Sequence, residues 1–283
     1  MSIRTIIPGH NTQDGAGVKL RRSLGANPHL RMDPFLMLDE FYSDNPEDYI
    51  AGFPSHPHRG FETITYMLEG RMRHEDHLGN TGLLETGGVQ WMTAGRGIIH
   101  SEMPEQKEGR MRGFQIWLNL PAAQKMTPAS YQDIPAEDIS QVALAQGGHI
   151  KVIAGEAHIA EQQVQGVINA DGSKHTDPQV WDIVLTANES VQFAPKAHWQ
   201  GGLYLYDGDA KVTDTTLPLR SMGALNPGEP IEIHAGPEGA RLLFLAGRPL
   251  KEDIAQYGPF VMNTEAEIIA AIQDYQTGRL TQY

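Results

Sequence analysis

Glycine and proline divide this sequence into segments that are too short for most helices. The chain has 30 glycines and 18 prolines among its 283 residues. The segments between them are rich in β-branched and aromatic residues, as in ETITYML (62–68), GFQIWL (113–118) and RLLFL (241–245). Short strand-like runs separated by turn residues are typical of β-sandwiches and β-barrels. The sequence therefore predicts an all-β protein.

The strand pattern is interrupted once. It runs to about residue 119 and is followed by LPAAQKMTPASYQDIPAED (120–138), which contains three prolines and little periodicity. Strand-like segments resume near residue 149 and continue to about residue 245. We therefore expect an N-terminal domain over residues 1–125, a linker over 126–145 and a C-terminal domain over 146–283.

One helix is expected, close to the C-terminus. Thr264 can cap its first turn, and Glu267 stands at the position that completes a capping box. Ile268, Ile269 and Ile272 give it an apolar stripe, and Gly278 is placed to end it. We expect this short helix to pack on a barrel as a strut.

Composition restricts the classes of function. The chain has no cysteine, which excludes disulfides, thiolate metal sites and a cysteine nucleophile. It shows neither a run of apolar residues long enough for a membrane helix nor a secretory signal, so we expect a soluble cytoplasmic protein. Its formal net charge of −13 disfavours direct binding to nucleic acid, because a field of that sign repels phosphate.

Two pairs of metal-ligand residues stand in strand-like segments. His56 and His58 flank a proline, and residues two apart on a strand project from the same face. His100 and Glu102 have the same relationship further along the chain. If a small barrel brings the pairs together, three imidazoles and one carboxylate suit Fe(II), Ni(II), Cu(II), Mn(II) or Zn(II). A closed zinc site or unrelated buried histidines are the alternatives.

The same residues carry a family resemblance. HPHRGFETITYMLEG (56–70) and WMTAGRGIIHSEMP (91–104) resemble the two signature segments of the pirin family, a bicupin branch of the cupin superfamily. DPFLMLDEF (33–41), MTPASYQDI (126–134) and YGPFVMNT (257–264) extend the similarity over nearly the whole chain.

The resemblance implies two stacked cupin-type β-barrels, with the metal in the first barrel and none in the second. It implies His56, His58, His100 and Glu102 as ligands of one divalent transition-metal ion, with Fe(II) favoured and Ni, Cu, Mn or Zn as alternatives. Many cupins use a glutamate four residues after the second histidine, which here is Glu62, but the pirin pattern favours Glu102. Glu62 is then a supporting barrel residue.

The resemblance also implies a function. It points to a quercetin 2,3-dioxygenase-type oxidoreductase whose substrates are a flavonol-like small molecule and dioxygen, with Glu102 as the catalytic base. The alternative is a metal- or redox-sensing regulator that binds a transcription factor or a metabolic enzyme as its protein partner.

Other polar residues near the motifs give weaker signals. His74 and His77 lie near a turn signal, and we expect both to be exposed to solvent. Arg59 is interpreted as a donor behind the metal ligands, an anion-orienting group or an ordinary surface arginine.

Overall fold

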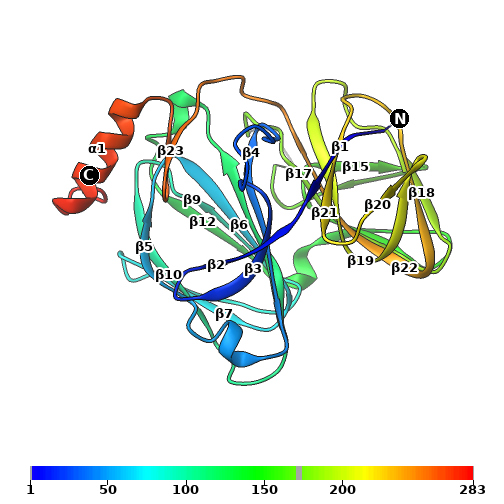
Figure 1. The fold of residues 1–283 in the computed structure, drawn as a ribbon, viewed down its shortest axis with the longest axis horizontal. Helices are drawn as coiled ribbons and strands as arrows, with labels where there is room; N and C mark the ends of the chain where they lie inside the picture. Colours follow the sequence, from blue (N-terminus) through cyan, green and yellow to red (C-terminus); the bar gives the residue numbers. More distant parts are fainter. Residues whose placement is uncertain (1, 170–173, 283) are drawn as a thin grey trace. The chain divides into compact units, whose positions relative to one another are not determined.

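The computed structural model describes residues 2–169 and 174–282. Within these ranges the chain forms two compact units, each assembled from segments that are distant in sequence. The N-unit contains residues 11–22, 35–136 and 250–282, and the C-unit contains residues 2–10, 23–34 and the described part of 137–249. Regular structure is almost entirely β-strand, with one α-helix near the C-terminus, which confirms the all-β prediction (Figure 1).

The N-unit contains a seven-stranded and a four-stranded sheet. The larger sheet has the order β12-β9-β6-β11-β4-β3-β2, and its strands in that order are Ser130–Ile134, Val89–Thr93, Phe61–Glu69, Met111–Asn119, Phe35–Ser43, Val18–Leu24 and His10–Asp14. The smaller sheet has the order β5-β10-β7-β8, and its strands are Phe53–His58, Ile98–Pro104, Met72–Asp76 and Thr81–Leu84. Short 3-10 turns cover Pro46–Asp48, Ala122–Gln124 and Ala136–Asp138.

The C-terminal segment adds β23 (Ala255–Tyr257), β24 (Phe260–Met262) and α1 (Glu265–Gln276) to the N-unit. The predicted capping box is present, since Thr264 and Glu267 each accept a hydrogen bond from the other's backbone N–H. One cluster of buried apolar side chains joins β24 to α1 and the residues after it, and Ile99 of β10 packs against it. The helix therefore supports a strand of the smaller sheet, as expected of a strut.

The C-unit is built around a nine-stranded sheet with the order β1-β21-β19-β22-β17-β14-β13, in which β18 also pairs with β22 and β20 with β19. The bounds of these strands are Ile3–Pro8, Ser221–Leu225, Gln200–Val212, Ile231–Gly247, Gln179–Leu185, His149–Ala154, Ser140–Ala143, Ser190–Phe193 and Thr215–Leu217. A separate hairpin joins β15 (Glu156–Ile159) to β16 (Gln162–Gln165). The core of the C-unit is apolar and includes the packed rings of Trp181, Phe193 and Phe244.

The two ends of the chain belong to opposite units. Strand β1 pairs with β21, so the N-terminus lies in the C-unit, whereas α1 lies in the N-unit. The boundaries expected from sequence placed residues 1–10 in the N-terminal domain and residues 250–283 in the C-terminal domain. The structure assigns the described residues of both segments to the other unit. The expected linker 126–145 contains two strands, because β12 pairs with β9 in the N-unit and β13 pairs with β14 in the C-unit.

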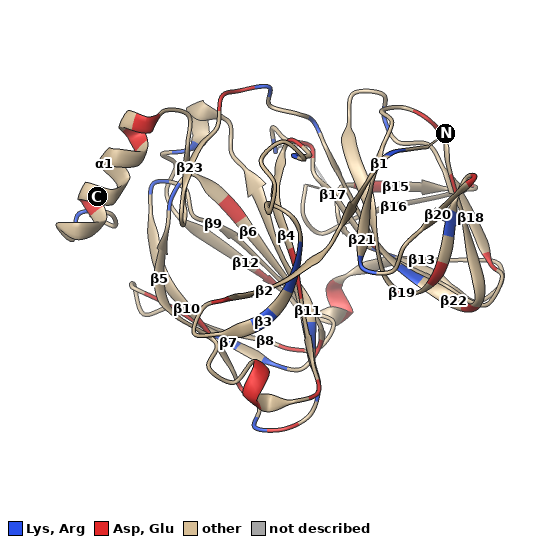
Figure 2. Cartoon of the chain, in the orientation of Figure 1, with Lys and Arg blue, Asp and Glu red and all other residues tan. Residues whose placement is uncertain are grey.

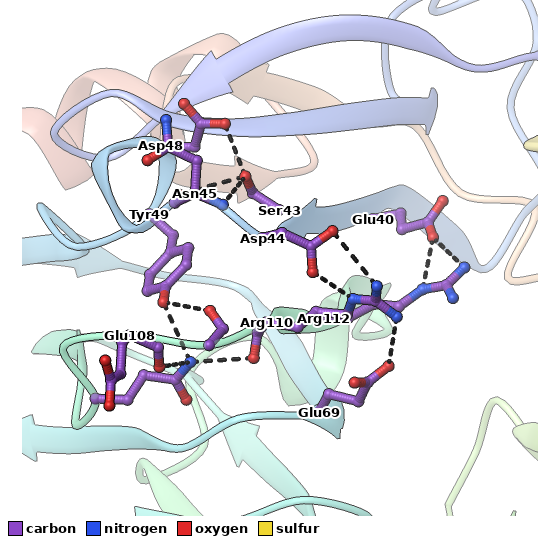
Figure 3. A network of polar contacts seen from close by, with 12 residues as sticks. Glu40, Ser43, Asp44, Asn45, Asp48, Tyr49, Glu69, Glu108, Arg110 and Arg112 are labelled. Atoms are coloured by element: carbon purple, nitrogen blue, oxygen red, sulfur yellow. Dashed lines mark hydrogen bonds and ion pairs between the residues drawn. The ribbon is translucent and has the colours of Figure 1, made fainter.

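Charged residues occur on strands and turns of both units and on α1 of the N-unit (Figure 2). A network of polar contacts in the N-unit ties β4 to β11 (Figure 3). Arg112 Nη2 lies 2.9 Å from the buried Glu40 carboxylate, and Arg110 Nε lies 2.7 Å from Asp44. Tyr49 donates a 2.7 Å hydrogen bond to the Gly109 carbonyl, which holds the turn that leads into β11. Among the described residues, no helix is long and apolar enough to cross a membrane.

Candidate metal centre

The first two histidines lie on β5 and the third lies on its neighbour β10. The strands are antiparallel, and their register sets His56 opposite His100 and His58 opposite Ile98. Pro57 is tolerated because β5 is at the edge of its sheet, where one side of the strand needs no hydrogen-bond donor. The register therefore places the three imidazoles on one face of the sheet.

A glycine shapes the turn that follows the histidine pair. Gly60 has a φ of +93°, and a Cβ at this position would lie 1.9 Å from the Val261 carbonyl oxygen. Any side chain here would push the turn away from β24. The glycine of the HPHRG segment is thus required by the close approach of two backbones.

The three imidazoles converge. One ring nitrogen from each of His56, His58 and His100 can be chosen so that all lie within 4.8 Å of one another. The ring centroids are 4.4 to 4.9 Å apart. Ligand nitrogens at about 2.1 Å from one ion are separated by up to about 4.2 Å, which is close to the spacing of this set.

Hydrogen bonds settle which nitrogens face the site. His56 Nδ1 lies 2.8 Å from the Pro54 carbonyl oxygen, and His100 Nδ1 lies 2.6 Å from His74 Nε2. Both histidines therefore keep Nε2 for another partner. His100 Nε2 and His58 Nδ1 are buried, and neither makes a hydrogen bond within the described part of the chain. A nitrogen that binds a metal ion makes no hydrogen bond to protein, so buried nitrogens without a hydrogen-bond partner are typical of metal ligands.

Burial keeps two of these histidines, His58 and His100, neutral. Loss of solvent, and then the neighbouring imidazoles, hold the pKa values of His58 and His100 well below the ordinary histidine value. A neutral imidazole has a lone pair on one nitrogen, whereas the protonated ring has none. The three histidines therefore fit a divalent transition-metal ion.

Glu102 shares the strand and the face of His100, but the group of converging ligand atoms does not include it. Its carboxylate is buried, and Oε1 lies 3.1 Å from the hydroxyl of Thr65. Thr65 belongs to β6 of the larger sheet. Thr65 is also 2.7 Å from Gln115 Oε1. Because a hydroxyl has a single proton, Thr65 donates to one of these oxygens at a time.

Glu62 faces the other way. Thr65 points toward Glu102. Residues an odd number apart on a strand project from opposite faces, so the Glu62 side chain lies on the face of β6 opposite Thr65. Its carboxylate accepts a 2.7 Å hydrogen bond from Thr93. This orientation fits the supporting role expected for Glu62.

His74 differs from our expectation. The sequence predicted an exposed residue near a turn, but His74 lies within β7 and is 4% exposed. It stands opposite Glu102 in the register between β7 and β10. The prediction was wrong because β7 extends further than the turn signal suggested. The alternation of Met72, His74 and Asp76 is the sequence signal that shows the shared face.

Arg59 also has a definite position. It is buried and makes a 2.9 Å ion pair from Nη1 to Asp274 of α1, and its Nε donates to the Arg96 carbonyl. Arg59 is therefore neither an ordinary surface arginine nor a group presented to a substrate. It links the residue after His58 to the C-terminal helix.

The inner face of the larger sheet is not sealed from solvent. Along β11, Phe114, Ile116 and Leu118 are fully buried, whereas the alternate residues Gln115 and Trp117 are partly exposed. These alternate residues face the histidines: the Trp117 ring lies 5.4 Å from that of His58, and Gln115 contacts Thr65. His56 is also partly exposed. Solvent therefore reaches the neighbourhood of the three histidines.

Comparison with known proteins places this geometry in a family. Residues 17–118 match the family model described as Pirin, and residues 180–281 match the one described as Pirin C-terminal cupin domain. The chain belongs to the pirin family. Its fold is accordingly the two-domain, all-β bicupin that the resemblance implied, with the short C-terminal helix that the capping residues predicted.

Individual family members are close in sequence and structure. A Pseudomonas aeruginosa protein named "Putative quercetin 2,3-dioxygenase" is 52% identical over 275 residues, covering 96% of this chain and 95% of that protein. A pirin-like protein of Caulobacter vibrioides is 44% identical and covers 97% of both. A crystal structure titled quercetin 2,3-dioxygenase, from Acinetobacter baumannii, superposes with a TM-score of 0.88 at 34% identity, covering 99% of this chain and 98% of the other.

Proposed function

We propose that this pirin is a metal-dependent dioxygenase that acts on flavonols such as quercetin, with His56, His58, His100 and Glu102 as ligands and Fe(II) as the ion. The observation that carries the proposal is the convergence of three imidazoles beside a buried carboxylate, in a place that solvent reaches. The names of the Pseudomonas and Acinetobacter relatives support the choice of substrate class.

Each side chain has a task in this proposal. The bound ion supplies Lewis-acid chemistry that makes a substrate hydroxyl easier to deprotonate. Glu102 accepts that proton, and Thr65, within hydrogen-bond distance of Oε1, orients the carboxylate toward the site. The Trp117 ring is partly exposed beside His58 and packs on the buried Phe61 ring at 4.3 Å, so it offers an apolar surface suited to a flat aromatic substrate.

The test is the consumption of quercetin under air by the metal-loaded protein. We expect chelated protein to be inactive and to regain activity when Fe(II) is restored. Glu102→Gln should keep most of the metal and lose about 10²- to 10⁴-fold in turnover, the usual contribution of a positioned base. Glu62→Gln is the matched control, because it changes the same kind of group on the opposite face and should leave turnover close to that of the parent.

Two results would contradict the proposal. Equal turnover by Glu102→Gln and the parent would remove Glu102 from the role of base. A parent protein that binds metal firmly but leaves quercetin unchanged under air would remove the flavonol dioxygenase activity altogether.

A further inference from the structure

We propose that His74 is a positioning residue for the metal site, which accepts a hydrogen bond from His100 Nδ1 and so directs His100 Nε2 to the ion. The proposal concerns the metal site alone and rests on that part of the proposed function. It does not depend on the substrate.

The contact between the two rings is short and shielded. His74 Nε2 lies 2.6 Å from His100 Nδ1, and both side chains are buried. A neutral imidazole has one N–H and one bare nitrogen, so one ring of the pair donates and the other accepts.

The surroundings of His100 decide the direction of this hydrogen bond. If His74 donated, the proton of His100 would sit on Nε2, which is buried and has no hydrogen-bond partner among the described residues. That arrangement would strand a buried N–H and block metal binding. If His100 donates, its proton is on Nδ1 and its Nε2 lone pair is free. The geometry therefore favours His74 as the acceptor.

His74 is itself held in place. It stands opposite Glu102 in the register of β7 and β10, so it belongs to the inner face of the smaller sheet. On its other side the Tyr131 ring of β12 lies 4.9 Å away in an edge-to-face contact. The ring is thus confined between His100 and Tyr131, and it cannot turn away without breaking a packed contact.

The test uses Co(II) as the probe, because its dissociation constant can be measured by competition with a chromophoric chelator and its visible spectrum reports the ligand set. His74→Leu removes the acceptor while keeping a side chain of similar size. We expect Co(II) to bind about 10- to 100-fold more weakly, the usual loss when the partner of a ligating histidine is removed, and we expect the visible bands to shift. His74→Gln restores an acceptor. Its dissociation constant for Co(II) should lie within a few-fold of that of the parent, and its visible spectrum should match that of the parent.

His158→Gln is the control, because His158 is an exposed histidine of the C-unit. Equal Co(II) affinity and spectrum in His74→Leu and the parent would overturn the proposal. An equal loss in His74→Leu and His74→Gln would also overturn it, because packing and not the hydrogen bond would then matter. If His74→Leu fails to fold, His74→Phe takes its place in the comparison, because it also removes the acceptor and keeps a ring to pack on Tyr131. A parent that binds Co(II) but does not consume quercetin would contradict only the flavonol activity.

Discussion

Lys125 is an unusual residue of the N-unit, because a lysine is rarely fully buried and this one is 1% exposed. Its Nζ donates to Gly60 O at 2.7 Å, to Asn119 Oδ1 at 2.6 Å and to Val261 O at 3.0 Å. Burial lowers the pKa of Lys125 to about 8 from its ordinary 10.5. The side chain thus joins the turn after the histidine pair to β24 at the cost of keeping a charge out of water.

This shift predicts a pH dependence of stability. Between pH 8 and 10.5 the unfolded chain holds a proton that the folded chain has released. The free energy of unfolding should therefore rise with pH over this window, by up to about 3 kcal/mol. Urea denaturation should show this rise in the parent and not in Lys125→Met. The exposed Lys107→Met should behave like the parent, and parallel pH curves for the parent and Lys125→Met would contradict the prediction.

At the residue scale, the sequence identified three histidines that the structure brings together, because alternation along a strand is visible in the order of residues. It missed His74. The burial of His74 depends on the pairing of β7 with β10 and on the ring of Tyr131, which comes from a segment far away in sequence. Local pattern carries no information on such partners.

At the scale of elements, α1 is tied to the turn that follows the histidine pair of β5. The Arg59–Asp274 pair is the link, with the arginine side chain 5% exposed and the aspartate 31% exposed. Leu280 O, just beyond the helix, lies 3.4 Å from Arg59 Nη2 and adds a second contact. The helix is therefore a support for the end of β5.

Asp274→Asn should weaken this support. It leaves a buried guanidinium without its counter-charge, and because Asp274 is partly exposed we expect a loss of about 1–3 kcal/mol in the free energy of unfolding. Chemical denaturation of the metal-free protein measures it. Arg279→Gln removes an exposed, longer pair to the same aspartate and should cost less than about 0.5 kcal/mol. A loss no larger in Asp274→Asn than in Arg279→Gln would show that the buried pair is unimportant.

The helix itself was predictable, because the capping box and the glycine after it act within a few residues. The strands in the expected linker were not. Ser130–Ile134 is mostly polar and lies between two prolines, and it forms an edge strand because β9 offers free backbone groups. Edge strands need little apolar sequence, so composition alone reads them as linker.

At the scale of the whole molecule, each unit depends on a segment from the far end of the chain. Strand β1 pairs along β21, and Ile3 belongs to the apolar core of the C-unit. Residues 250–282 supply β23, β24 and α1 to the N-unit. A cut at the expected domain boundary therefore separates each unit from part of itself.

Reciprocal truncations test this arrangement. Removal of residues 250–283 should abolish Co(II) binding and the cooperative unfolding of the N-unit, because Arg59 and Lys125 lose partners there. Removal of residues 2–10 should destabilise the C-unit and leave Co(II) affinity within a few-fold of the parent. Chelator competition and near-UV circular dichroism distinguish the two. Full Co(II) affinity after the C-terminal truncation would contradict the prediction.

The sequence by itself determined the all-β class, the capped helix, the candidate ligands and, through its signature segments, the family. These features depend on spacing within a segment, which the order of residues displays directly. The tertiary structure alone decided that the N-terminal segment belongs to the C-unit and the C-terminal segment to the N-unit. It also decided that Arg59 binds α1 and that His74 contacts His100. Such contacts join segments far apart in sequence, and the backbone hydrogen bonds and buried polar pairs that make them leave no periodic trace in either segment.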